Sequence, residues 1–214
     1  MFYLQEQAGQ TSSGRGVITE KVVVRTLEDS TDLGGRLHWE ARRGGLGRAK
    51  NKLVLGDGVA WIWNLKAARW PEAKELLDFW HAGQHLWTLG RACNGMDDLK
   101  AKPWVEKRLH QLRHGQEWAV LNEIAALKAS RSQTGKIVKK EKKYFANQSR
   151  RMNYKEIADQ GWPIGSGSVE SSCRQDQCRF KRPGQSWTRA GFGNLSALDQ
   201  ARRNNHWDEL WLSA

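Results

Sequence analysis

The chain has 214 residues, of which 39% are hydrophobic and 27% are charged, as in an ordinary soluble globular protein. No apolar run approaches the roughly 20 residues of a membrane-spanning helix. The N-terminal residues lack the pattern of a signal peptide, and an odd number of cysteines, three, argues against a disulfide framework. The composition therefore predicts a cytoplasmic protein with one hydrophobic core, or one core and a small subdomain, and with no membrane partner.

The chain carries a net charge of +12, and its isoelectric point is about 9.9. Such a charge attracts polyanions through a field that does not depend on sequence, although a basic protein without such a partner can have the same composition. Twelve tryptophans are a second unusual feature. Indole rings pack in cores and interfaces, and they also stack on bases. The two features together favour nucleic acid as a partner.

Short strands separated by turns are predicted in the first part of the chain. Residues 22–27 are rich in β-branched side chains, which are typical of strands. Residues 34–40 predict a turn that leads into a strand or a helix. Residues 53–58 are a short apolar run ending on Asp57 between two glycines, a pattern typical of a buried parallel strand with a functional carboxyl end. A further strand is expected over residues 75–81.

Helices are predicted in the rest of the chain, where apolar residues recur near helical spacing. Their expected ranges are 82–92, 104–128, 136–152, 168–180 and 187–211. The last range is expected to pack through its large apolar residues, which are Leu195, Leu198, Trp207, Leu210 and Trp211. Cys173 and Cys178 lie five residues apart on one predicted helix, off a shared face, and are interpreted as buried apolar side chains.

Two carboxylates stand where a metal site could form. Asp57 closes a predicted strand, and Glu170 falls in the first turn of a predicted helix after a Gly/Ser loop. Carboxylate oxygens are the ligands that hard divalent cations prefer, and two such ions about 4 Å apart can assist phosphodiester displacement. Simpler interpretations remain: Asp57 can be a turn residue, and Glu170 can complement the positive end of its helix.

Asp78 and His81 form a second pair, with His85 one helical turn further on. No cysteine pair accompanies them at the spacing of a zinc site. We therefore expect a supporting role rather than direct metal ligation, in which His81 hydrogen-bonds Asp78 and orients the junction between a strand and a helix.

Basic residues follow the candidate glutamate closely. They are Arg174, Arg179, Lys181, Arg182 and Arg189, with Trp187 among them. A second cluster consists of Lys136, Lys139, Lys140, Lys142 and Lys143. A run of charges is often only a solvated face. The first cluster nevertheless lies where a phosphate backbone would have to pass, and Trp187 could stack on an unpaired base.

Five strings of residues stand in order along the chain and resemble one family. They are Asp-Gly-Val-Ala-Trp-Ile-Trp at 57–63, Asp-Phe-Trp-His at 78–81, Pro-Ile-Gly-Ser-Gly-Ser-Val-Glu at 163–170, Arg-Phe-Lys-Arg-Pro-Gly at 179–184 and Trp-Asp-Glu-Leu-Trp at 207–211. Together they resemble the C-terminal portion of ISKra-group insertion-sequence transposases, which are DDE-type relatives of the Mutator-like elements. The resemblance runs from about Val22 to Trp211.

This resemblance implies an α/β chain with a ribonuclease H-like fold, whose two aspartates and one glutamate hold two Mg²⁺ ions. Asp57 would be the second aspartate and Glu170 the glutamate, and both would be catalytic metal ligands. Residues 1–98 would be the core, 99–160 a mainly helical insertion, and 161–214 the core helices with the glutamate. The implied activity is DNA cleavage by water at transposon ends, followed by strand transfer to target DNA. Asp78 and His81 would match the family's signature beside the catalytic centre.

The chain departs from the family pattern at the first aspartate. Residues 1–21 contain no Asp, while Asp29 and Asp32 follow the first predicted strand in a turn-like context. We therefore expect a C-terminal fragment with an incomplete fold, impaired in cleavage on its own. A non-catalytic DNA-binding remnant is the alternative, and a nuclease acting on RNA is less favoured. The missing opening strand predicts an unpaired sheet edge, and with it association into a homo-oligomer.

Overall fold

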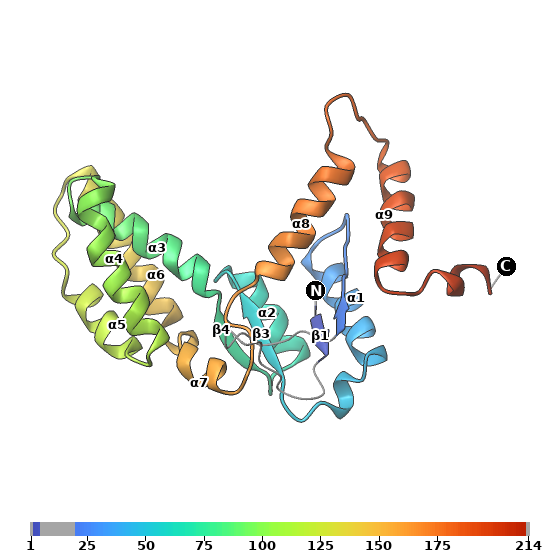
Figure 1. Cartoon of the computed structure of the whole chain (residues 1–214), viewed down its shortest axis with the longest axis horizontal. Helices are drawn as coiled ribbons and strands as arrows, with labels where there is room; N and C mark the ends of the chain where they lie inside the picture. The colour runs from blue at the N-terminus through green and yellow to red at the C-terminus, as the bar shows by residue number, and fades with distance from the viewer. Residues whose placement is uncertain (1, 5–19, 213–214) are drawn as a thin grey trace.

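The computed structural model describes residues 2–4 and 20–212, and it is an elongated, mainly helical molecule (Figure 1). Its strands are β1 Phe2–Leu4, β2 Glu20–Val22, β3 Leu53–Gly56 and β4 Lys74–Leu77. Its helices are α1 Ser30–Arg43, α2 Ala60–Arg69, α3 Phe79–Cys93, α4 Asp98–Arg113, α5 Glu117–Ala126, α6 Gln133–Gln148, α7 Tyr154–Asp159, α8 Gly167–Phe180 and α9 Arg189–Arg203. Three short 3₁₀ helices are η1 Leu46–Arg48, η2 Ser149–Arg151 and η3 Asp208–Trp211.

A small parallel sheet lies in the middle of the molecule. Strands β3 and β4 pair in parallel from Leu53 opposite Lys74 to Gly56 opposite Leu77, and α2 makes the crossover between them. Strands β1 and β2 pair antiparallel in a separate sheet. These are the two sheets of the described residues, so the ribonuclease H-like fold is not shown. The α/β expectation is confirmed only as a helical fold with a small parallel sheet.

The strand predicted over residues 22–27 is largely wrong, because only its first residue belongs to β2. The following backbone is extended, but it pairs with side chains instead of a neighbouring strand. Val23 donates its amide to Asn204 Oδ1 at 2.8 Å and accepts from Asn204 Nδ2 at 2.9 Å. The amide of Arg25 donates to Gln200 Oε1 at 2.8 Å. Side-chain amides at the end of α9 thus take the place of a strand partner.

Capping residues correct two further element predictions. Residues 34–40 lie wholly inside α1, which begins after Asp29 because the Asp29 carboxylate accepts the first free backbone amides of the helix. The strand expected over 75–81 ends at Leu77, since Asp78 caps the N-terminus of α3. In both places a helix begins at an aspartate.

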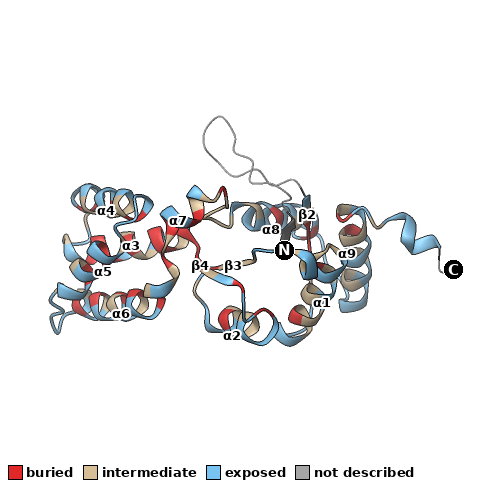
Figure 2. Ribbon diagram, turned by 90° about the horizontal axis from the view of Figure 1, so that it is seen from below, coloured by how far each residue is buried: buried red, intermediate tan, exposed pale blue. Residues whose placement is uncertain are grey.

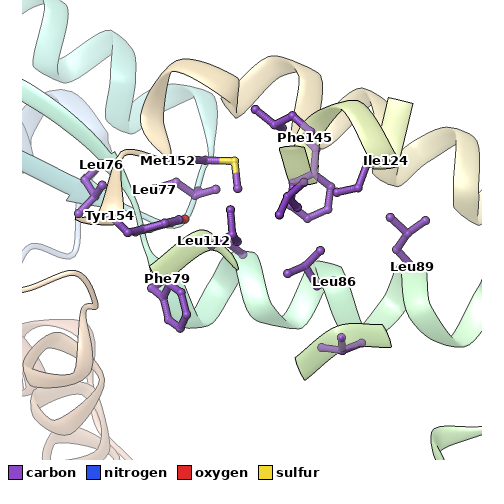
Figure 3. Close-up of a cluster of buried hydrophobic side chains, with 14 of the residues drawn as sticks. Leu76, Leu77, Phe79, Leu86, Leu89, Leu112, Ile124, Phe145, Met152 and Tyr154 are labelled. Carbon is purple, nitrogen blue, oxygen red and sulfur yellow. The ribbon is translucent and has the colours of Figure 1, made fainter. Parts of the chain in front are cut away.

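Helices α3 to α7 form a bundle with the main hydrophobic core. Its fully buried side chains include Leu76, Leu77, Phe79, Leu86, Leu89, Leu112, Ile124, Phe145, Met152 and Tyr154 (Figure 3). Figure 2 shows buried residues, in red, along these helices. The core therefore joins strand β4 directly to the helical segment. The predicted helix 104–128 is divided into α4 and α5 around Gly115, whose φ of 75° breaks the helix. The helix predicted over 136–152 is confirmed as α6 followed by η2.

Helices α8 and α9 lie at the other end of the molecule, joined by a long loop, and the chain before α1 rises between them (Figure 1). Helix α8 confirms the prediction for residues 168–180. The predicted range 187–211 is interrupted at Asn205, which has a φ of 58°. The expected packing of this range is mostly wrong, because four of its large apolar residues are exposed. They are Leu198, Trp207, Leu210 and Trp211.

Candidate functional site

Asp57 lies at the carboxyl edge of the parallel sheet, directly after β3, and is exposed. Its Oδ1 accepts the Val59 amide at 3.1 Å, which closes a tight turn. Helix α6 holds this turn from the other side: Tyr144 Oη donates to the Asp57 carbonyl at 3.2 Å, and Gln148 Nε2 donates to the Gly58 carbonyl at 2.9 Å. The turn is therefore anchored on the helical bundle.

Asp78 follows β4 at the same sheet edge, and it is buried. Its Oδ1 accepts the backbone amide of His81 at 2.7 Å, and its Oδ2 accepts the backbone amide of Ser166. The neighbouring Phe79 amide donates to the Ile164 carbonyl at 3.0 Å. The expected link between Asp78 and His81 is thus made through the backbone. Asp78 also fixes the loop that leads into α8, a contact that the sequence analysis missed.

Glu170 lies in the first turn of α8 and is exposed. Its amide donates to the carbonyl of Ser166, the residue whose own amide Asp78 holds. The structure therefore ties the loop before Glu170 to the sheet edge that carries Asp57 and Asp78. The helix N-terminus also favours a negative charge at this position.

The Mg²⁺ site implied by the family resemblance needs several oxygen ligands around one point. Within the part of the chain that the structure describes, no group of three or more His, Cys, Asp or Glu side chains could hold a metal ion. Both oxygens of Asp78 already accept backbone amides. The described residues therefore do not form a complete two-ion site, and among them Asp57 and Glu170 remain the candidate ligands.

A pair formed by half-buried His85 and buried Glu141 beside the turn was not found by sequence reasoning. His85 Nδ1 lies 2.6 Å from Glu141 Oε2, and the Glu141 side chain is only 3% exposed. The His85 ring stacks on Tyr144, with ring centroids 3.6 Å apart. Burial, followed by the charge of Asp57, raises the pKa of Tyr144, so its hydroxyl stays protonated and can donate to the turn. A signal was present: Glu141 shares helical spacing with the apolar Val138 and Phe145.

The predicted DNA-binding residues divide into two groups. Arg179, Arg182 and Trp187 line a cleft of about 520 Å³ between α8 and α9. Arg174, Lys181 and Arg189 are exposed and are not among its lining residues, and Arg189 Nη2 lies 2.6 Å from Glu28 Oε1. The cleft also contains two arginines of α9 that were not among the predicted DNA-binding residues, Arg202 and Arg203.

Asp199 of α9 organises the floor of this cleft, with a fully buried side chain. Its Oδ2 lies 3.0 Å from Arg25 Nη1 and 2.9 Å from Arg203 Nε. Its Oδ1 lies 3.3 Å from Arg179 Nε and 3.6 Å from Arg202 Nη2. Burial alone would raise the pKa of Asp199, but the surrounding arginines outweigh it and lower the pKa, so the carboxylate stays charged.

Two further predictions concern the cysteines of α8 and the lysine cluster of α6. Cys173 and Cys178 are exposed, so their interpretation as buried residues is wrong; the residues of α8 that are buried are Ser172 and Phe180. In the lysine cluster of α6, Lys142 Nζ donates to the Leu127 carbonyl at 2.7 Å. The other four lysines are exposed: Lys136, Lys139, Lys140 and Lys143.

Among the helices of the described residues, none combines the length and apolarity needed to cross a membrane. Comparison of the chain with protein-family models, with curated proteins and with solved structures finds no match.

Proposed function

We propose that this chain is the C-terminal part of a DDE-type DNA transposase, and that on its own it binds DNA but cuts it poorly. The proposal rests on the placement of two acidic residues at one sheet edge and on the contact that ties this edge to the helix bearing Glu170. Asp57 and Asp78 follow two parallel strands at one sheet edge, and Asp78 holds the loop that starts the helix bearing Glu170. The same three residues lie in the strings that resemble ISKra-group transposases.

DNA binding is supported by charge. The net charge of +12 and the arginine-lined cleft between α8 and α9 both favour a phosphate backbone. In this proposal the partners are transposon ends and target DNA, and Asp57 and Glu170 are the ligands for Mg²⁺. Impaired cutting follows from chemistry, since two carboxylates hold a metal ion less firmly than three and align the attacking water less well.

Two measurements on the purified chain test the proposal. Binding to a duplex is measured at several salt concentrations, and nicking of supercoiled plasmid is measured with and without Mg²⁺. We expect binding that weakens steeply with salt and nicking at background. Absence of salt-sensitive duplex binding would refute the proposal. The expectation of impaired cutting would be refuted by strong Mg²⁺-dependent nicking that is abolished in Glu170→Gln. The same nicking should persist in the control Glu106→Gln, on the exposed face of α4.

A non-catalytic DNA-binding remnant is the second candidate, and the lack of a complete ligand group among the described residues favours it. Thermal unfolding with and without Mg²⁺ separates the two. A transposase site would show Mg²⁺-dependent stabilisation that Asp57→Asn and Glu170→Gln each reduce, because ligand bound to the native state raises its stability. A remnant would bind DNA equally well but show no such stabilisation.

A further inference from the structure

We infer that the cleft between α8 and α9 binds one unpaired nucleotide of a DNA strand, with its phosphate on the arginines and its base on Trp187. The inference rests on the proposed DNA-binding function and names the form of DNA that this cleft takes. Three observations support it: a surplus of positive charge, an immobilised indole, and the size of the cleft.

Two of the arginines around the cleft are neutralised within the protein. The guanidinium of Arg25 pairs with both Asp176 and Asp199, and that of Arg203 does the same. These two arginine side chains are only 14% and 15% exposed. Two arginines and two aspartates therefore form a closed set of ion pairs beneath the cleft. This set fixes the positions of α8 and α9 relative to the chain before α1.

Three further arginines of the cleft lie outside this set and have no carboxylate of their own to neutralise them. The side chains of Arg179 and Arg202 are 46% and 65% exposed, at longer distances of 3.3 and 3.6 Å from the already paired Asp199. Arg182 is exposed, and its Nε donates to the Cys178 carbonyl at 2.7 Å, which orients the guanidinium. Since Asp199 is the acidic residue among the described lining residues, these three guanidinium groups are available to an anion. Guanidinium groups are well suited to phosphate oxygens.

Trp187 lies beside these arginines and is held in one orientation. Its Nε1 donates to the Phe180 carbonyl at 3.0 Å, and its ring meets the Phe180 ring edge-on, with centroids 6.3 Å apart. The residue is still 42% exposed. An indole whose polar group is satisfied within the protein, and which remains accessible beside cationic side chains, is typical of a platform on which a base stacks.

The exposed indole favours an unpaired nucleotide over a duplex. The cleft is open to solvent, and its volume of about 520 Å³ falls within the range of small-ligand sites. In a duplex, the faces of each base are covered by the bases above and below it. Trp187 can therefore stack only on a base that is single-stranded or has left the helix.

Strand-binding measurements test the inference. Fluorescence anisotropy is used to compare a twelve-residue thymidine strand, the same strand with abasic sugars in place of the bases, and a twelve-base-pair duplex. We expect the wild-type chain to bind the thymidine strand about five-fold or more tightly than the abasic strand, as stacking on one indole predicts. Trp187→Ala should remove that difference, whereas Trp118→Ala at an exposed position of α5 should leave it intact.

Charge is tested separately from stacking. Arg202→Gln should lower the slope of log affinity against log salt for the thymidine strand by about 0.7, the value for one lost phosphate contact. Arg131→Gln, in the exposed loop between α5 and α6, is the matched control and should not alter this slope. Circular dichroism of each variant reports whether the fold is retained, and the abasic comparison on the wild-type chain remains decisive if Trp187→Ala does not fold.

The outcomes separate this inference from the proposed function. Equal binding of the thymidine and abasic strands by the wild-type chain would overturn the nucleotide site. If salt-sensitive duplex binding persisted in that case, the proposed function would stand. Loss of salt-sensitive binding to every DNA would instead overturn the proposed function itself.

Discussion

The carboxylate of buried Asp78 accepts the backbone amide of Ser166, which lies 88 residues further along the chain. Its other oxygen caps α3 through the amide of His81. One side chain thus joins the end of β4, the start of α3 and the loop before α8. Glu170 takes its position relative to the sheet from this junction.

Substitution of Asp78 should destabilise the protein. In Asp78→Asn, the amide nitrogen replaces one acceptor and faces a backbone N–H, so one buried donor loses its partner. We expect the free energy of unfolding to fall by about 1–3 kcal/mol, and by more in Asp78→Ala, which removes both acceptors. Urea unfolding measures the effect. Asp57→Asn keeps an acceptor at an exposed turn and should cost less than about 0.5 kcal/mol; equal losses in both variants would contradict the junction role.

Asp199 should make stability depend on acid pH. Its pKa is lowered in the folded protein because the arginine ion pairs outweigh burial. Because the pKa of Asp199 is lower in the folded protein than in the unfolded chain, its charged form stabilises the fold. This contribution is fully present above the unfolded pKa, near 3.9, and is lost as the pH falls toward the folded pKa. Asp199→Asn leaves Arg25 and Arg203 to share the single carboxylate of Asp176, and because both arginine side chains are largely buried it should cost about 3 kcal/mol at pH 7.

The difference between wild type and Asp199→Asn should therefore shrink when urea unfolding is repeated below pH 4. Asp208→Asn, in the exposed η3, serves as the control and should change stability by less than about 0.5 kcal/mol at either pH. A difference for Asp199→Asn that stays constant from pH 7 to pH 3 would show that its charge does not contribute in this way.

The contact between half-buried His85 and buried Glu141 predicts that substitutions at the two positions have non-additive effects on stability. His85→Leu leaves the Glu141 carboxylate in the core without its partner and should cost about 3–5 kcal/mol. Replacing both residues by leucine removes the buried charge and should cost less than the single change. Thermal or urea unfolding of the single and double variants decides this. His114→Leu, at an exposed position, should be close to neutral, and additive losses at 85 and 141 would argue against a coupled pair.

Two glycines should respond in opposite directions to alanine. At Gly58, where φ is 96°, an added Cβ would lie 2.9 Å from Tyr144 Oη and 3.1 Å from Leu77 Cδ1. Gly58→Ala should therefore cost about 1–3 kcal/mol and disturb the turn that carries Asp57. Gly167 begins α8, has no atom within 4 Å of an added Cβ, and should gain about 0.4–1 kcal/mol as alanine. Differential scanning calorimetry compares the two variants, and stabilisation by Gly58→Ala would contradict the crowding of the turn.

Local patterns identified much of the secondary structure and the positions of the candidate carboxylates. The apolar run before Asp57 is β3, and the helical spacing after the Gly/Ser loop is α8 with Glu170 in its first turn. These features depend on neighbours within a few residues, so they can be predicted from spacing alone. The strand predicted over 22–27 failed for the opposite reason, since whether an extended segment forms a strand depends on a partner elsewhere in the chain.

The cleft and the junctions between elements were decided only by tertiary packing. Asn204 replaces a strand partner for Val23 across 181 residues, and Glu141 meets His85 across 56. Arg202 and Arg203 join the predicted Arg179 and Arg182 only because α9 lies beside α8. Composition and spacing describe which groups a chain contains and which face of an element they share. The burial and pairing of those groups depend on how distant elements pack. A buried charge or amide needs a partner, and tertiary packing decides which residue supplies it.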